Sequence, residues 1–196
     1  SAVAGRERKA PDRRPNILCL VCEDIRPYLG CYGDKLADTP NLDRFAQEGI
    51  RYTHMFTTIG VSAPSRASLI TGLFPTSFGA NYMRTSNTKP LTEGLVPPYE
   101  ALPADGVRCY TEFLRAAGYY CTNNVKTDYQ FKPSVTAWDE SSKTAHWKNR
   151  PEGMPFFAIF NMTVTHESQV WKRANEPLVL SPDEIILPPY HPDNAV

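Results

Sequence analysis

Two uninterrupted apolar runs stand out in the pattern of hydrophobic and polar residues along this chain. The first covers Ile17 to Cys22, and the second covers residues 155 to about 164. Continuous apolar runs of this length, without alternation, are typical of strands buried on both faces of a parallel sheet. We therefore predict two buried strands here, and a third, more polar strand over residues 119–125.

Apolar residues at helical spacing predict three helices, over residues 39–49, 64–71 and 107–117. Thr39-Pro40 suits the start of the first, because Thr favours the N-cap and Pro the first turn. Each helix ends at or just before a glycine, the residue that most readily terminates one: Gly49, Gly72 and Gly118. Strands and helices in this order predict an α/β fold, in which helices flank a mainly parallel sheet.

The amino-acid composition predicts long loops and argues against several classes of protein. Proline accounts for 18 of the 196 residues, and we predict mostly loop over 75–103 and irregular structure over 177–196. The 21 Lys and Arg residues balance the 21 Asp and Glu residues. A general nucleic-acid binder needs a basic excess, so this balance argues against one. No apolar run approaches the ~20 residues of a membrane span, and five cysteines are too few for a disulfide scaffold.

The first 14 residues are polar and basic, and we predict that residues 1–14 form a flexible arm. The chain begins with Ser1 and shows no apolar signal-peptide core. We interpret it as a processed product whose signal peptide has been removed. That interpretation implies a secreted, periplasmic or lysosomal-type compartment.

Reactive side chains follow the predicted strands: Glu23 and Asp24 the first, Lys126 the middle one, His166 the last. Because ligands bind at the C-terminal edge of open α/β sheets, these residues form a candidate site. Ser62 would add a hydroxyl near a helix N-terminus, which favours anions. Each residue also has an ordinary alternative, such as a helix cap for Ser62 or a surface lysine for Lys126. Placement alone leaves phosphoryl and sulfuryl transfer open.

One segment resembles the signature of the type I sulfatases, a family of the alkaline phosphatase-like superfamily. The segment Ser62-Ala-Pro-Ser-Arg-Ala-Ser-Leu-Ile-Thr-Gly72 matches every defined position of that signature, which begins with Cys or Ser. Further segments are similar to the family's first strand, next helix, second signature and later histidine strand: residues 14–24, 39–49, 118–126 and 155–166. The resemblance implies that residues 15–196 form the N-terminal portion of a sulfatase catalytic domain.

The resemblance implies a formylglycine-dependent hydrolase of sulfate esters, with sulfated carbohydrates as expected substrates. A maturation enzyme would oxidise Ser62 to formylglycine, whose hydrate has one hydroxyl to attack sulfur and another to release sulfate. Arg66 and Lys126 would hold the nucleophile and the sulfate oxygens. His166 would protonate the leaving oxygen.

The family also implies a divalent cation, usually Ca²⁺, which Asp24, Glu23 and Ser62 would bind. Two Asp residues are more common than Glu-Asp there, and Asp128 stands where the family often has a histidine. The later acidic segment that completes the family's metal site has no counterpart after His166. We therefore expect the remaining ligands, strands and C-terminal domain to come from a second polypeptide or a continuation.

Substrate recognition rests on fewer signals. Arg84 and Asn123 are candidates for contact with a sulfated glycan, although both could equally be packing residues. The glycosylation sequon Asn161-Met162-Thr163 falls inside a predicted strand, so we expect it to be unused. Two alternative functions stay open: a phosphoester or phosphonate hydrolase of the same superfamily, and a non-catalytic sulfate- or glycan-binding protein.

Overall fold

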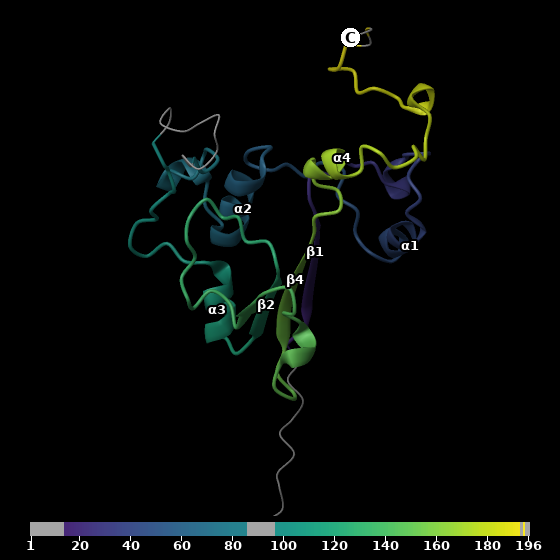
Figure 1. Ribbon diagram of the computed structural model, residues 1–196. Helices are drawn as coiled ribbons and strands as arrows, with labels where there is room; N and C mark the ends of the chain where they lie inside the picture. The colour runs from purple at the N-terminus through teal and green to yellow at the C-terminus, as the bar shows by residue number, and fades with distance from the viewer. Residues whose placement is uncertain (1–13, 86–96, 193, 195–196) are drawn as a thin grey trace, which may run out of the picture. The chain divides into compact units, whose positions relative to one another are not determined.

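The computed structural model describes residues 14–85, 97–192 and 194 (Figure 1). The chain divides into two compact units, Ser1–His166 and Glu167–Val196. Because the described residues begin at 14, almost all of the predicted arm over residues 1–14 lies outside them. Its last member, Arg14, places its guanidinium over the ring of Tyr119, 5.4 Å from the centroid.

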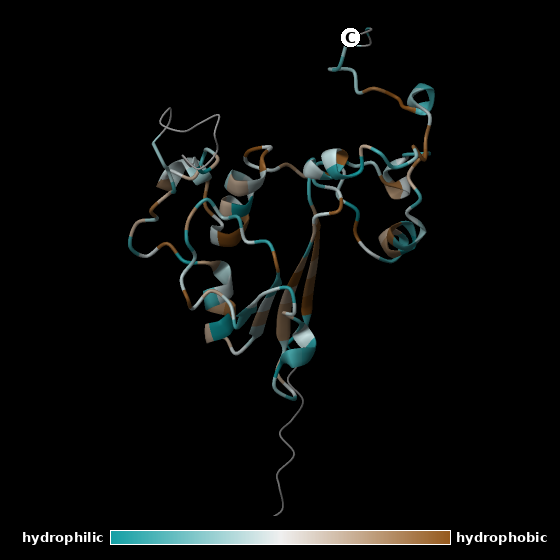
Figure 2. Cartoon of the chain, viewed as in Figure 1, coloured by the Kyte–Doolittle hydropathy of each residue, from teal (hydrophilic) through white to brown (hydrophobic). Residues whose placement is uncertain are grey.

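A four-stranded sheet forms the centre of the first unit. Its strands are β1 (Ile17–Cys22), β2 (Tyr120–Asn124), β3 (Glu140–Ser141) and β4 (Phe156–Met162), in the spatial order β1-β4-β2-β3. Every pairing is parallel, so all four strands present their C-terminal ends at one edge. The predicted parallel α/β sheet is confirmed, and Figure 2 shows its strands as mostly apolar ribbon.

Two helices pack against one face of this sheet: α2 (Ser62–Thr71) and α3 (Tyr110–Ala116). Ala67 and Ile70 of α2 join a buried cluster with Phe157 and Ile159 of β4. The Tyr110 ring meets the Phe157 ring edge-on, with centroids 5.4 Å apart. This packing fixes α2, and with it the segment that begins at Ser62, over the strands.

The opposite face of the sheet carries the alternate residues of each strand. A 3₁₀ turn, η3 (Trp147–Asn149), stacks the Trp147 ring on Phe156 with centroids 5.2 Å apart. On β1, by contrast, Leu18 and Leu20 are 53% and 57% exposed. The sheet is therefore covered unevenly on its two faces.

The segment after β1 holds a 3₁₀ turn, η1 (Gly30–Tyr32), and helix α1 (Pro40–Glu48). The Asp43 carboxylate accepts the Cys31 N–H at 2.7 Å, and the Thr39 hydroxyl accepts the Gly30 N–H at 2.9 Å. These bonds tie the turn to the start of the helix. A further 3₁₀ turn, η2 (Pro75–Phe78), follows α2.

The second unit contains a short helix, α4 (Ser168–Lys172), and a 3₁₀ turn, η4 (Pro182–Glu184). Ser181 and Glu184 cap the turn reciprocally, since the Ser181 hydroxyl accepts the Asp183 N–H and the Glu184 carboxylate accepts the Ser181 N–H. Among the residues that the structure describes, no helix has both the length and the apolar character needed to cross a bilayer.

Candidate functional site

Side chains from three strand ends and one helix start meet at the C-terminal edge of the sheet. Glu23 follows β1, Lys126 follows β2, and Thr165 and His166 follow β4. The N–H of Glu23 donates to the carbonyl of Met162 at 3.1 Å, which continues the β1–β4 pairing. The Thr165 hydroxyl donates to the Glu23 carbonyl. These backbone ties fix the position of the Glu23 carboxylate.

Ser62 is the first residue of α2, two residues earlier than the predicted start of that helix. Val61 occupies the N-cap position, and no side chain caps the helix. The Ser62 hydroxyl instead donates to Glu23 Oε2 at 2.9 Å. The alternative interpretation of Ser62 as a helix cap is therefore wrong, because its hydroxyl is aimed at the carboxylate from the first strand.

Glu23 accepts hydrogen bonds from three side chains that the sequence had singled out. Besides Ser62, Lys126 Nζ lies 2.6 Å from Oε2, and Arg66 Nη2 donates to Oε1. Glu23 is 4% exposed and Arg66 6% exposed. Four predicted residues, from three segments that are distant in sequence, thus form one contiguous cluster around a buried carboxylate.

The environment of Glu23 strongly favours its charged form. Burial alone would raise the pKa of this carboxyl group. Hydrogen bonds from Lys126, Arg66 and Ser62, together with the charge of Arg66, outweigh burial and lower the pKa from its ordinary 4.5 to about 2. At neutral pH the cluster therefore holds one carboxylate between two cations.

Asp24 and His166 form the second part of the site. Asp24 Oδ2 lies 4.0 Å from His166 Nε2, a distance that gives an ion pair when the imidazole is protonated. Asp24 has a φ of 48°, in the left-handed region that Asp tolerates better than most residues. This conformation turns the chain directly after Glu23. The Asp24 carboxylate therefore faces His166, whereas the Glu23 carboxylate contacts other side chains.

Arg84 reaches the site through Asp128. The Arg84 guanidinium pairs with Asp128 Oδ1, and Asp128 Oδ2 lies 3.6 Å from Lys126 Nζ. Asp128, which stands where the family often has a histidine, therefore links two cationic side chains in this chain. Arg84 is 36% exposed, at the open side of this group.

Asn123 lies behind the site and is fully buried. Its side chain bonds to Asn161 of β4 and to Ser141 of β3. Both polar atoms of the Asn123 side chain are occupied by these neighbours, and its contact with a substrate stays a prediction. The sequence pointed to Asn161 only as part of a glycosylation sequon and not as a residue of the site. A polar residue near the end of an otherwise apolar strand was the available signal.

The described residues do not by themselves form a complete calcium site. No group of three or more His, Cys, Asp or Glu side chains suited to a metal ion occurs among them. Glu23 and Asp24 supply two carboxylates, whereas Ca²⁺ takes 6–8 oxygen ligands. Both Glu23 oxygens already accept bonds from Ser62, Arg66 and Lys126.

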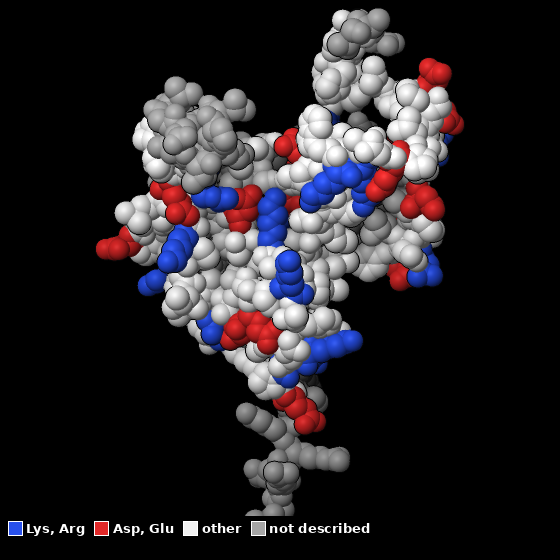
Figure 3. Space-filling model, viewed as in Figure 1, with Lys and Arg blue, Asp and Glu red and all other residues white. Residues whose placement is uncertain are grey.

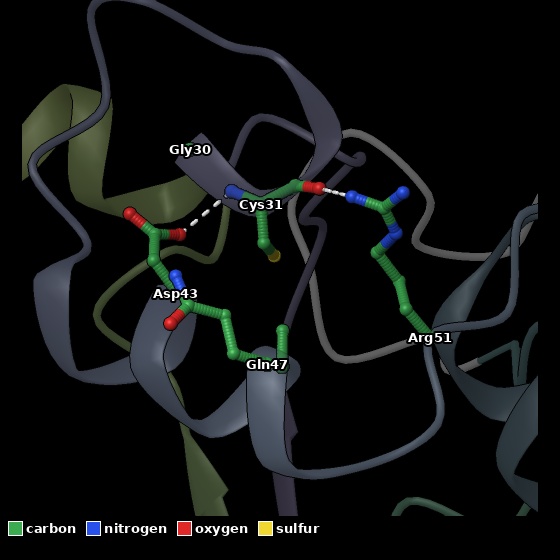
Figure 4. A pocket seen from close by; sticks show the side chains of 6 residues that line it. Gly30, Cys31, Asp43, Gln47 and Arg51 are labelled. Carbon is green, nitrogen blue, oxygen red and sulfur yellow. Dashed lines mark hydrogen bonds between the residues drawn. The ribbon is translucent and has the colours of Figure 1, made fainter.

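A separate hollow lies between η1 and α1, away from the predicted site residues (Figure 4). Its polar groups largely satisfy one another, because Asp43 accepts the Cys31 N–H and Arg51 donates to the Cys31 carbonyl. Figure 3 shows basic and acidic residues interspersed over one face of the molecule.

Known proteins of one family are similar to this chain in sequence and in fold. A family model described as Sulfatase matches residues 15–151. An ulvan-active sulfatase of Formosa agariphila is 55% identical over 167 residues, which are 85% of this chain and 27% of that protein.

Two solved structures share the fold. A 2-O GAG sulfatase aligns with 92% of this chain and 41% of its own, with a TM-score of 0.60 at 20% identity. A protein solved in complex with its substrate D-glucosamine-2-N,6-O-disulfate aligns with 79% of this chain and 35% of its own, with a TM-score of 0.60 at 23% identity.

A parallel sheet with flanking helices, the sulfatase signature at the start of α2 and these matches define the class: the chain belongs to the sulfatase family, with the alkaline phosphatase-like fold. The chain spans about a quarter of the length of the ulvan-active sulfatase and less than half of the two solved chains.

Proposed function

We propose that this chain carries the nucleophile-bearing half of a sulfatase site that hydrolyses sulfate esters. The observation that carries the proposal is the convergence on Glu23. Ser62 Oγ and Lys126 Nζ lie 2.9 and 2.6 Å from Glu23 Oε2, and Arg66 donates to the other oxygen. A nucleophile precursor and two cations next to it are what transfer of an anionic sulfuryl group requires.

The chain's own residues have distinct roles in this proposal. Arg66 and Lys126 neutralise oxygens of the sulfuryl group, with Arg66 offering the planar fork that suits oxyanions. His166 donates a proton to the leaving oxygen from Nε2, and Asp24 can pair with the imidazolium form. Glu23 keeps the two cations in place and accepts a hydrogen bond from the Ser62 hydroxyl.

The family resemblance adds formylglycine at Ser62. This aldehyde, produced from Ser62 by an oxidising maturation enzyme, supplies in its hydrated form a nucleophilic hydroxyl and a second hydroxyl for sulfate release. Ser62 suits this modification because its side chain makes no helix cap and shares the Glu23 carboxylate with both cations. The maturation enzyme is therefore part of the proposal.

A divalent cation remains a prediction, as does its coordination by Glu23, Asp24 and Ser62. Because the described residues supply too few ligands, we derive no step through the ion. Elemental analysis of the purified protein would test for it. The expected continuation or second polypeptide, and the secreted, periplasmic or lysosomal-type compartment, likewise stay predictions.

Sulfated carbohydrates are the substrate class that we favour. The support comes from relatives: one is named for its action on ulvan, and one solved neighbour was complexed with a disulfated glucosamine. Arg84, at the open side of the site, is the described cation best placed to contact a further anionic group on such a substrate.

The test is expression of the protein containing this chain together with a formylglycine-generating enzyme. We expect the Ser62 peptide to be lighter by two hydrogen atoms and to react with aldehyde probes. We expect hydrolysis of a 4-methylumbelliferyl sulfate or a sulfated oligosaccharide, and its loss in Ser62→Ala. Activity that persists while Ser62 stays unmodified would overturn the formylglycine mechanism.

The same protein preparation also tests the two alternative functions. A rate on 4-methylumbelliferyl phosphate that exceeds the rate on the sulfate would indicate a phosphoester hydrolase. Glycan binding without sulfate release, by protein whose Ser62 is fully converted, would indicate a binding protein.

A further inference from the structure

Asn161 interrupts the apolar sequence of β4 and uses all of its side-chain polar atoms. Its Oδ1 accepts a hydrogen bond from Arg66 Nη1 at 2.8 Å. Its Nδ2 donates to Asn123 Oδ1 at 2.9 Å and to the Asn124 carbonyl at 3.2 Å. Only one orientation of the amide satisfies a guanidinium donor on one side and carbonyl acceptors on the other.

The bonds continue through the sheet in one direction. Arg66 donates to Asn161, Asn161 donates to Asn123, and Asn123 Nδ2 donates to Ser141 Oγ at 2.9 Å. This chain of donors runs from α2 across β4 and β2 to β3. Hydrogen bonds aligned in this way polarise one another. Because Asn123 is fully buried, its hydrogen bonds lie in a medium of low dielectric constant, where they are stronger than in water.

Arg66 is held at both terminal nitrogens as a result. Nη2 donates to Glu23, whereas Nη1 donates to Asn161 and has a longer contact of 3.4 Å with the Lys126 carbonyl. A single carboxylate contact would leave the guanidinium plane free to rotate. The second contact, on a different strand, fixes that plane in a side chain that is 6% exposed.

We propose that Asn161 is a positioning residue of the sulfuryl-transfer site, which fixes the guanidinium of Arg66 for the sulfate, and that Asn123 supports Asn161. Asn123 would then act behind the site, in place of the substrate contact predicted from the sequence. The kinetic part of this inference rests on the proposed function. The structural part, immobilisation of Arg66, can be measured without activity.

The first experiment uses NMR on protein labelled with ¹⁵N-arginine. Wild-type protein should show resolved, slowly exchanging Nη–H signals for Arg66, assigned by their absence in Arg66→Lys. Asn161→Ala should remove them. Asn161→Asp keeps an acceptor for Arg66 and should retain them, which also covers the case in which Asn161→Ala does not fold.

The matched control is Asn149→Ala. Asn149 also uses its amide within the protein, donating to Glu140 Oε2 at 2.8 Å, but makes no described contact with Arg66. This variant should leave the Arg66 signals unchanged. Arg66 signals that persist in Asn161→Ala, or vanish equally in Asn149→Ala, overturn the proposal.

The second experiment is a double-mutant cycle on the matured enzyme. Asn161→Ala should lower kcat/KM about tenfold to a hundredfold in the wild-type background, since a small misplacement of a catalytic group costs that much. In an Arg66→Lys background it should lower kcat/KM less than about twofold, because its effect passes through Arg66. Equal losses in both backgrounds would show that Asn161 acts otherwise. Absence of any sulfatase activity would defeat the proposed function, while the NMR result would still decide the role of Asn161.

Discussion

Glu23 illustrates how one residue can organise a site whose other members come from distant segments. Its carboxylate accepts from Ser62 of α2, from Arg66 of the same helix and from Lys126 after β2. Removal of one partner from a buried ion pair leaves an uncompensated charge and typically costs about 3–5 kcal/mol. The stability of the first unit and the arrangement of the site therefore depend on the same carboxylate.

This dependence predicts how stability changes with pH. The pKa of Glu23 is lower in the folded protein, about 2, than its ordinary 4.5. The contribution of Glu23 is therefore complete above pH 4.5 and is lost as the pH falls toward 2. The lowering of the Glu23 pKa corresponds to about 3 kcal/mol in the free energy of unfolding. Urea denaturation with a chelator present should show this loss in wild-type protein.

Glu23→Gln is the variant that tests the assignment. It should be less stable at pH 7 and should show a shallower fall in stability between pH 4.5 and 2. Glu152→Gln, at an exposed carboxylate, should follow the wild-type curve. Parallel curves for Glu23→Gln and wild type would mean that another group titrates in this range.

Several site residues could be predicted because their sequence positions have simple structural meanings. Glu23 and Lys126 follow strands, and parallel strands deliver their ends to one edge. Asn161 could not be predicted in this way. Its role depends on the β1-β4-β2-β3 strand order, which places Asn161 beside Asn123, and the sequence pattern does not contain that order.

At the scale of the element, α2 shows how a helix can be ended by one residue. Gly72 has a φ of 70°, and its N–H donates to the Ser68 carbonyl. A residue with a side chain adopts this left-handed conformation only at a cost. Gly72 thus determines where α2 ends, and with it the length of the helix that begins at Ser62.

Gly72→Ala should therefore destabilise the chain by about 1 kcal/mol. A Cβ at Gly72 would have open space around it, so the cost would be conformational and not steric. Gly60→Ala is the control, because a Cβ there also meets nothing and its φ is not in the left-handed region. Equal unfolding midpoints for the two variants would contradict this explanation.

Other elements show which helix boundaries and which short elements the sequence pattern does not predict. Helix α3 begins at Tyr110, three residues after the predicted start, because Cys109 and Glu112 form a capping box there. The two-residue strand β3 and the short helix α4 were not predicted. Elements of two to five residues are too short to show a hydrophobic period, and pairing with β2 alone defines β3.

At the scale of the whole molecule, the apolar surface is unevenly distributed. Parallel sheets usually have both faces covered, yet Leu18 and Leu20 are 53% and 57% exposed. We expect the 196-residue chain alone to bind the dye 8-anilinonaphthalene-1-sulfonate. Leu18→Thr with Leu20→Thr should weaken the fluorescence, whereas Val135→Thr, at a residue 94% exposed in a loop, should change it little. Unchanged fluorescence in the double variant would place the dye elsewhere.

The charges around the site balance, as they do over the chain as a whole. Leaving His166 aside, the described ion pairs of the site join three cationic and three anionic side chains: Arg66, Lys126 and Arg84, with Glu23, Asp24 and Asp128. Such a group has almost no long-range field, so under the proposed function a sulfated substrate would reach it by unguided diffusion and be captured only on contact. Raising NaCl from about 50 to about 300 mM should then change kcat/KM less than about twofold. A steep decline would reveal electrostatic steering by charges outside this group.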